Sequence, residues 1–204
     1  MSRIAVLVLV SGGGSNLAAI LEASRDPEYG VEIVAVGADR EGTGGVELAA
    51  AAGIPTFVCR VSDYADRGSW DEALTEMTAR YNPDLVVSAG FLKLCGNSFL
   101  ERFGGRFVNT HPALLPSFPG MHGARDALDY GVKLTGATLF LVDSGVDTGV
   151  ILAQVAVPVK EDDDVETLTE RIKVAERAQL VETVGRMARE GWHVEGRRAR
   201  VGRR

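Results

Sequence analysis

The sequence has little cysteine and little histidine, and both shortages narrow the classes of protein to which it can belong. Two cysteines, Cys59 and Cys95, and three histidines occur among its 204 residues. Two cysteines do not make the disulfide framework that holds small secreted domains together. We therefore expect both thiols to be reduced and the protein to be cytoplasmic.

Several motifs that would identify a chemistry are also missing. The sequence has no His-x-x-x-His pair and no triad of carboxylate residues at ligand spacing, so we expect no metal. It has no G-x-S-x-G motif, which argues against a hydrolase with a nucleophilic serine at a strand–helix turn. The G-K-[ST] of a Walker motif is absent as well.

No segment has the length of apolar sequence that a transmembrane helix requires. The opening MSRIAVLVLV resembles a signal peptide, but its apolar run leads into a Gly-rich turn and an amphipathic segment without a convincing cleavage site. A buried parallel strand explains it better. The net charge of −6 argues against nonspecific nucleic-acid binding. We expect small-molecule substrates and neither a membrane nor a nucleic acid as partner, and the oligomeric state stays open.

What the sequence does contain is an alternation of apolar, β-rich runs with helical patterns. In the first half it predicts strands at 4–10, 31–38, 56–60 and 84–90, and helices at 15–24, 46–53 and 69–80. Ser15 and Ser69 are the expected caps of two of these helices. Regular strand–helix alternation is typical of an α/β fold in which helices cover both faces of a mostly parallel, twisted sheet.

The second half departs from this alternation near residue 100. It predicts strands at 106–111, 133–143 and 150–159, a short helix at 124–131, and a long helix at 164–191. Asp164 is the expected N-cap of the long helix, and Gly191 its expected end. We predict one domain, 1–195, with halves at 1–100 and 101–195. The Arg-rich tail, 196–204, has no apolar periodicity and is predicted to be disordered.

The turn S-G-G-G-S-N at 11–16 follows the first predicted strand and opens the first predicted helix. Glycines let a ligand approach the backbone closely, and a helix N-terminus offers unpaired N–H groups, so phosphate is the natural ligand. A simple tight turn is the alternative. A dinucleotide fingerprint fits less well, because Leu17 stands where G-x-G-x-x-G requires glycine.

Asn109 and His111 lie two residues apart in a predicted strand, so their side chains share a face of the sheet. Pro112 removes a ladder donor and ends that strand. An amide donor beside an imidazole suits oxyanion stabilisation and proton transfer. Asp147, in the Gly-rich loop 143–149, either makes an ordinary Asx turn or brings its carboxylate to His111, where it would favour the imidazolium.

Four segments together resemble the phosphoribosylglycinamide formyltransferase family, over about residues 4 to 192. They are V-S-G-G-G-S-N-L (10–17), A-G-F-L-K-L (89–94), N-T-H-P-A-L-L-P-S-F-P-G-M-H (109–122) and V-D-T-G-V-I-L-A-Q (146–154). The resemblance implies a Rossmann-like formyltransferase fold. It also implies transfer of a formyl group from 10-formyltetrahydrofolate to glycinamide ribonucleotide, in de novo purine (IMP) biosynthesis.

The resemblance also implies roles for individual residues. The catalytic residues it implies are Asn109, His111 and Asp147. For the ribonucleotide, the implied residues are Gly14, Ser15, Asn16, Lys173 and Glu176. For formyl-folate, they are Arg67, Leu92, Lys93, Leu94, Cys95, Asp143, Ser144, Gly145, Val146 and Asp147.

Two other functions remain open at this point. The run G-V-K-L-T-G-A-T at 131–138 is similar to formyltetrahydrofolate deformylase, which passes the formyl group to water. That enzyme normally carries an additional N-terminal domain, whereas this chain starts at the first predicted strand. A nucleotide-binding sensor without catalysis is the alternative from another class, and the presence of Asn109, His111 and Asp147 argues against it.

Overall fold

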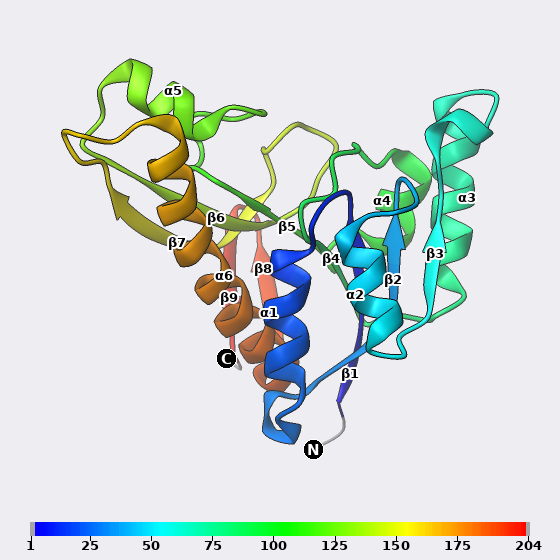
Figure 1. Cartoon of the computed structure of the whole chain (residues 1–204). Coiled ribbons are helices and arrows are strands. Elements are labelled where there is room, and N and C mark those ends of the chain that lie inside the picture. Colours follow the sequence, from blue (N-terminus) through cyan, green and yellow to red (C-terminus); the bar gives the residue numbers. More distant parts are fainter. Residues whose placement is uncertain (1–2, 203–204) are drawn as a thin grey trace. The chain divides into compact units, whose positions relative to one another are not determined.

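A computed structural model describes residues 3–202 of the chain. Seven strands form one sheet in the order β3-β2-β1-β4-β5-β6-β7, and two further strands form a separate hairpin (Figure 1). The predicted α/β class with a mostly parallel sheet is confirmed. Of the helices within residues 3–202, none has both the length and the apolar character needed to cross a membrane.

The chain divides into two compact units, Met1–Asn109 and Thr110–Arg204. The boundary therefore falls inside β5, about nine residues beyond the predicted change at residue 100. The prediction of a change near residue 100 followed the change in strand–helix alternation. The units instead divide within one strand, where the local sequence pattern does not change.

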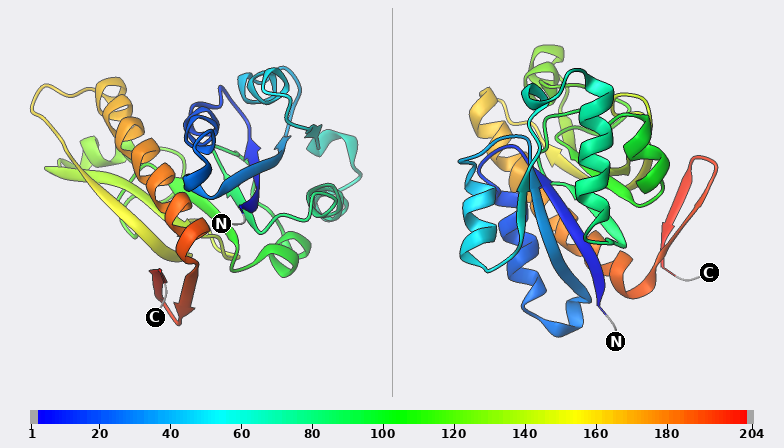
Figure 2. Two further views of the ribbon diagram at one scale, coloured as in Figure 1. Left: turned by 90° about the horizontal axis from the view of Figure 1, so that it is seen from below. Right: turned by 90° about the vertical axis from the view of Figure 1, so that its right-hand side faces the viewer.

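The first unit is a parallel sheet wound on both sides. Its elements are β1 (Ile4–Val10), α1 (Ser15–Ser24), the 3₁₀ helix η1 (Pro27–Tyr29), β2 (Val31–Ala38), α2 (Gly44–Ala51), β3 (Thr56–Val58), the 3₁₀ helix η2 (Val61–Asp63), α3 (Arg67–Ala79), β4 (Leu85–Ser88), α4 (Asn97–Phe103) and the start of β5 (Phe107–His111). Helices α1 and α2 cover one face, and α3 and α4 the other (Figure 2). Burial on both faces explains why Val6–Val10 and Leu85–Ser88 are almost wholly apolar and inaccessible.

Strands β1 and β4 are neighbours in the sheet, but the helices that follow them, α1 and α4, lie on opposite faces. This is the point at which the strand order reverses. In open α/β sheets, ligands bind beyond the carboxyl ends of the strands at such a point. The Gly-rich turn after β1 and the segment after β4 both begin there.

Helix starts were the least accurate predictions in the first unit. The N-cap of α1 is Gly14 and carries no side-chain cap, so Ser15 is the first helical residue and not the predicted cap. Helix α3 is capped by Asp66, whose side chain accepts from the Ser69 amide. In return, the Ser69 hydroxyl accepts from the Asp66 amide. Ser69 thus completes a capping box as its third residue. Thr43 caps α2, which begins at Gly44, two residues before the predicted start. Helix α4 was not predicted.

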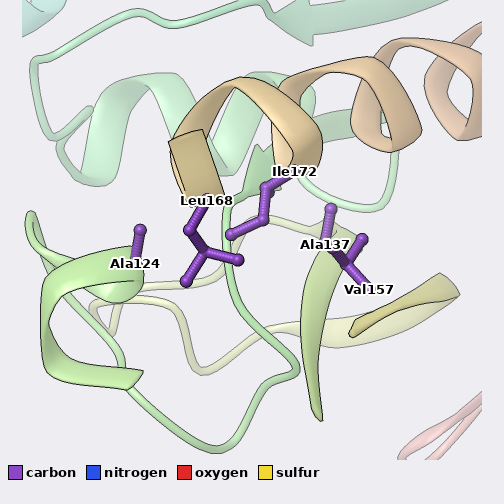
Figure 3. Close-up of a cluster of buried hydrophobic side chains, with 5 residues drawn as sticks. All are labelled: Ala124, Ala137, Val157, Leu168 and Ile172. Carbon is purple, nitrogen blue, oxygen red and sulfur yellow. The ribbon is translucent and has the colours of Figure 1, made fainter. Parts of the chain in front are cut away.

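The second unit contains α5 (Gly123–Tyr130), the antiparallel strands β6 (Leu134–Leu141) and β7 (Val150–Pro158), α6 (Val165–Glu190), and the strands β8 (Trp192–Glu195) and β9 (Arg198–Val201). A buried apolar cluster joins α5, β6, β7 and α6 (Figure 3). Its members are Ala124, Ala137, Val157, Leu168 and Ile172. This cluster fixes α6 on the β6–β7 pair.

The predicted ends of α6 are confirmed. The Asp164 side chain accepts from the Thr167 amide in a second capping box, and Gly191 ends the helix with φ 76°. Hydrogen bonds from the Thr167 amide lower the pKa of the Asp164 carboxyl. Beside it, the Arg171 guanidinium holds the pKa of Asp163 well below its usual range, because its two nitrogens lie 2.5 and 2.7 Å from the carboxylate oxygens. Local signals therefore identified this helix end to end.

The predicted disorder of the tail is wrong for the part that the structure describes. Residues 198–201 form β9, which pairs antiparallel with β8 and packs near β7 and α6. Arg198 and Arg200 occupy alternate, exposed positions of β9, a period of two that a search for an apolar run does not detect. The prediction for Arg203 and Arg204 lies outside the described residues.

Candidate active site

Strand β5 places Asn109 and His111 at its carboxyl end, with Pro112 directly after it. The backbone is regular up to Asn109, which is the register partner of Ser88 on β4. His111 is 4% exposed, whereas Asn109 is half-buried. The predicted strand end, with two polar side chains at i and i+2, is present.

The ring of His111 lies between two oxygen acceptors. Its Nδ1 is 3.4 Å from Oδ2 of Asp147, and its Nε2 is 2.7 Å from the backbone carbonyl oxygen of Phe118. A neutral imidazole has one N–H, so it can donate to only one of them, whereas an imidazolium can donate to both. The expected meeting of Asp147 with His111 is confirmed as a contact.

Asp147 itself is held in an unusual backbone conformation. Its φ is 54°, in the left-handed region that residues other than glycine seldom adopt. Its Oδ2 accepts from the Gly120 amide at 2.8 Å and faces His111 at the same time. A single carboxylate oxygen thus ties the Pro-rich loop to the imidazole.

Asp143 closes the loop that carries Asp147. Its Oδ1 accepts from the Gly145 amide at 3.1 Å and from the Thr148 hydroxyl at 2.6 Å. At Gly149 a Cβ would lie 1.7 Å from the Leu141 carbonyl oxygen, so the chain leaves the loop where no side chain fits. The structure therefore gives Asp143 a part in shaping the loop, with that oxygen already engaged.

Two residues that sequence reasoning did not select hold the Pro-rich segment after β5. Thr138 and Gln154 are register partners across β6 and β7. The Thr138 hydroxyl donates to the Ala113 carbonyl at 2.7 Å and accepts from the Leu115 amide at 3.0 Å. Gln154 Nε2 donates to the Leu115 carbonyl at 2.8 Å. The available signal was Thr138, a buried polar residue inside an apolar strand, which needs hydrogen-bond partners.

The Gly-rich turn of the first unit packs on the start of α2. The Gly45 amide donates to the Gly12 carbonyl at 3.1 Å, and a Cβ on Gly14 would lie 2.7 Å from the Gly45 Cα. Gly14 also has φ 77°. By contrast, a Cβ on Gly12 or on Gly13 would meet nothing within 4 Å. Gly14 is thus required for packing, and the open side of the turn lies over Gly12 and Gly13.

Four interactions fix the segment after β4, all within the first unit. The Leu92 amide donates to the Ser11 hydroxyl at 2.9 Å, and Lys93 Nζ lies 3.3 Å from the buried carboxylate of Asp39. The Arg67 guanidinium donates to the Leu94 carbonyl. The Gly96 amide donates to the Asp71 carboxylate at 2.5 Å.

This segment, 92–95, is the part of the predicted folate set that the structure ties together with Arg67. Leu92 and Leu94 expose 56% and 65% of their surfaces. Apolar side chains exposed on a rigid segment suit contact with a flat, apolar ligand ring. Burial, with a smaller contribution from the Asp71 charge, raises the pKa of the Cys95 thiol to about 12, which disfavours the thiolate form at neutral pH.

The predicted pair on the long helix α6 is less uniform. Lys173 is exposed and lies 2.7 Å from Oε1 of Glu170, one turn earlier. Glu176 is 8% exposed. The helix thus places Lys173 in a surface ion pair and Glu176 in a buried position. Within residues 3–202, no three His, Cys, Asp or Glu side chains gather as a metal site would require.

Comparison with known proteins gives one consistent result. The formyl transferase family matches residues 3–184. A phosphoribosylglycinamide formyltransferase of Mycobacterium tuberculosis is 55% identical over 199 residues, which cover 98% of this chain and 92% of that protein. The trifunctional purine biosynthetic protein adenosine-3 of Homo sapiens is 40% identical over 171 residues, 84% of this chain and 17% of that protein.

Solved structures agree with the sequence comparison. The crystal structure of glycinamide ribonucleotide transformylase 1 from Symbiobacterium toebii has a TM-score of 0.95 and 39% identity, covering 98% of this chain and 95% of that one. With the family match over most of its length and a relative at 55% identity, the chain belongs to the formyl transferase family, in the branch of the phosphoribosylglycinamide formyltransferases.

Proposed function

We propose that this chain transfers the formyl group of 10-formyltetrahydrofolate to the amine of N1-(5-phospho-D-ribosyl)glycinamide. The products are formylglycinamide ribonucleotide and tetrahydrofolate, within purine biosynthesis. The observation that carries the proposal is the buried His111 between Asp147 and the Phe118 carbonyl, in a chain 55% identical to a curated enzyme of that name.

In the proposed reaction the primary amine of the ribonucleotide attacks the formyl carbon. A tetrahedral intermediate forms, and the formyl oxygen takes on negative charge. Asn109 donates to this oxygen through its side-chain amide. Protonated His111 supplies a second, charged donor through its Nε2–H, which exchanges the Phe118 carbonyl for the formyl oxygen. Donors aimed at developing charge are worth more than donors to a neutral carbonyl, so they accelerate the chemical step.

Asp147 completes the proposed chemistry by orienting the imidazole. Its Oδ2 lies 3.4 Å from Nδ1 and limits rotation of the ring. Collapse of the intermediate breaks the bond between the formyl carbon and the folate nitrogen. The proton lost by the attacking amine reaches that leaving nitrogen, with Asp147 assisting through water.

The acceptor's phosphate is proposed to bind at the N-terminus of α1. The helix begins at Ser15 after a glycine N-cap, which has no side chain to accept from the first amides. The positive end of the helix dipole favours an anion there. Gly14, Ser15 and Asn16 form this turn, and Glu176 and Lys173 are proposed to contact the glycinamide.

The proposed formyl-folate residues fall in two segments. One is the tied segment 92–95 with Arg67, and the other is the loop 143–147. The reaction has no step that calls for a metal. That the protein needs no metal, binds no nucleic acid and is cytoplasmic stays a prediction.

Acceptor dependence is the first test. We expect formyl-folate to be consumed only when glycinamide ribonucleotide is present. The change in absorbance of the folate measures this loss. Equal loss without the acceptor would identify the deformylase. If formyl-folate is lost in neither case, the nucleotide-binding sensor is the remaining alternative. Calorimetry should then detect binding of the ribonucleotide without turnover.

Asn109→Ala should lower kcat by roughly 100–1000-fold, because it removes one donor to the developing oxyanion. Binding of the ribonucleotide should change little. The matched control is Thr110→Val, the next residue of β5, whose buried hydroxyl has no hydrogen-bond partner in the described structure. Steady-state kinetics of both variants decide the matter, and half-parental activity in Asn109→Ala would remove its oxyanion role.

Gly13→Val should raise KM for the ribonucleotide and leave the melting temperature nearly unchanged, because its side chain enters open space above the turn. Gly14→Ala serves as the contrasting variant. It combines φ 77° with a Cβ 2.7 Å from Gly45, so it should lower the melting temperature. Equal weakening of both substrates by Gly13→Val would place the phosphate elsewhere.

A further inference from the structure

The C-terminal hairpin of the second unit is fixed at its base. Strands β8 and β9 pair from Trp192–Val201 to Glu195–Arg198. The Gly202 amide donates to the Gly191 carbonyl at 2.9 Å, and the Arg186 side chain on α6 donates to the Val201 carbonyl at 2.9 Å. The hairpin is therefore anchored to the end of α6, and its turn has a defined position.

That turn consists of Gly196 and Arg197. Gly196 has φ 58°, as the first residue of a two-residue hairpin turn with glycine in that position requires. From this turn, Arg197 Nη2 donates to the carbonyl oxygens of Thr148 and Gly149, at 2.9 and 3.2 Å. These are the two residues that directly follow Asp147.

The loop that carries Asp147 is thus held from both sides. Asp143 binds its interior through the Gly145 amide and the Thr148 hydroxyl. Arg197 binds its exit through two backbone carbonyls. Between these ties, Asp147 adopts a φ of 54°, in the left-handed region that aspartate tolerates better than most residues other than glycine.

We propose that Arg197 is a positioning residue that keeps the Asp147 carboxylate against the His111 ring. The guanidinium does not touch the reacting atoms in this arrangement and acts only through the loop. The proposal rests on the function proposed above, in which Asp147 orients His111. It assigns a catalytic consequence to the C-terminal hairpin, where the sequence had suggested a disordered end.

An exposed arginine such as Arg197 contributes little to global stability. Its effect on geometry is a different matter, because displacing a catalytic group by about 1 Å can cost roughly 100-fold in rate. Loss of Arg197 should therefore separate stability from turnover. A residue that merely supported the fold would move both together.

The test compares Arg197→Ala with Arg197→Lys and with the control Arg198→Ala. Arg198 is an exposed arginine next to Arg197 on the same hairpin. We expect Arg197→Ala to lower kcat roughly 10-fold, with little change in KM for either substrate or in melting temperature. The Lys variant, which keeps a charged donor, should recover part of the loss. Arg198→Ala should match the parent.

Two further measurements show whether Arg197 acts through Asp147. Arg197→Ala in an Asp147→Asn background should lower kcat no further, because the positioned charge is already gone. Hydrogen exchange of the segment 143–150 should be faster in Arg197→Ala than in Arg198→Ala. This second readout needs no turnover, so it holds even if the proposed reaction is wrong.

Three results would overturn the proposal. They are unchanged kcat in Arg197→Ala, unchanged exchange in segment 143–150, and a further full 10-fold loss in the double variant. If the parent enzyme itself shows no formyl transfer, the proposed function fails first. Faster exchange in Arg197→Ala would then support only the tie on the loop, and the catalytic part of the proposal would fall with the function.

Discussion

The constraint on which the site depends is a buried imidazole with an oxygen acceptor at each ring nitrogen. His111 has almost no contact with solvent, so its polar atoms must find partners within the protein. A carboxylate oxygen of Asp147 lies beside one ring nitrogen, and the backbone carbonyl oxygen of Phe118 lies beside the other. The other features of this part of the second unit serve to keep those acceptors in place.

Those features come from distant parts of the sequence. Thr138 and Gln154, paired across β6 and β7, hold the backbone of the Pro-rich segment that supplies the Phe118 carbonyl. Asp143 and Arg197 hold the loop that supplies Asp147. The apolar cluster of α5, α6 and the two strands makes this frame rigid. A site formed on loops thus obtains its precision from the strands and helix beneath them.

The sequence was informative where a local signal determines local structure. Apolar runs gave the strands, and Asp164 with Gly191 gave both ends of α6. The i, i+2 spacing of Asn109 and His111 placed them at a strand end before any contact was known. Starts of helices were less accurate. Gly14 has no capping side chain to mark the start of α1, and Asp66 caps α3 together with Ser69, the residue predicted as the cap. Thr43 caps α2 through its own side chain and lies before the apolar run from which that helix was predicted.

Long-range contacts could not be obtained from spacing. The approach of Asp147 to His111 was one of two open alternatives, and the ties made by Thr138, Gln154 and Arg197 carry no motif of their own. Each joins residues at least 16 positions apart, so only the folded chain brings them together. The disorder predicted for the tail failed for the same reason, because the hairpin is stabilised by partners on α6 and beyond Asp147.

Replacing Asp147 by asparagine tests the central claim most directly. Asparagine keeps an oxygen that can accept from the Gly120 amide and removes only the negative charge that faces His111. We predict a fall in kcat of roughly 100–10,000-fold, the range of general acid–base assistance, with the melting temperature and ribonucleotide binding nearly unchanged. Near-parental kcat in a folded Asp147→Asn variant would contradict the account, since the loop would then need the shape of that side chain and not its charge.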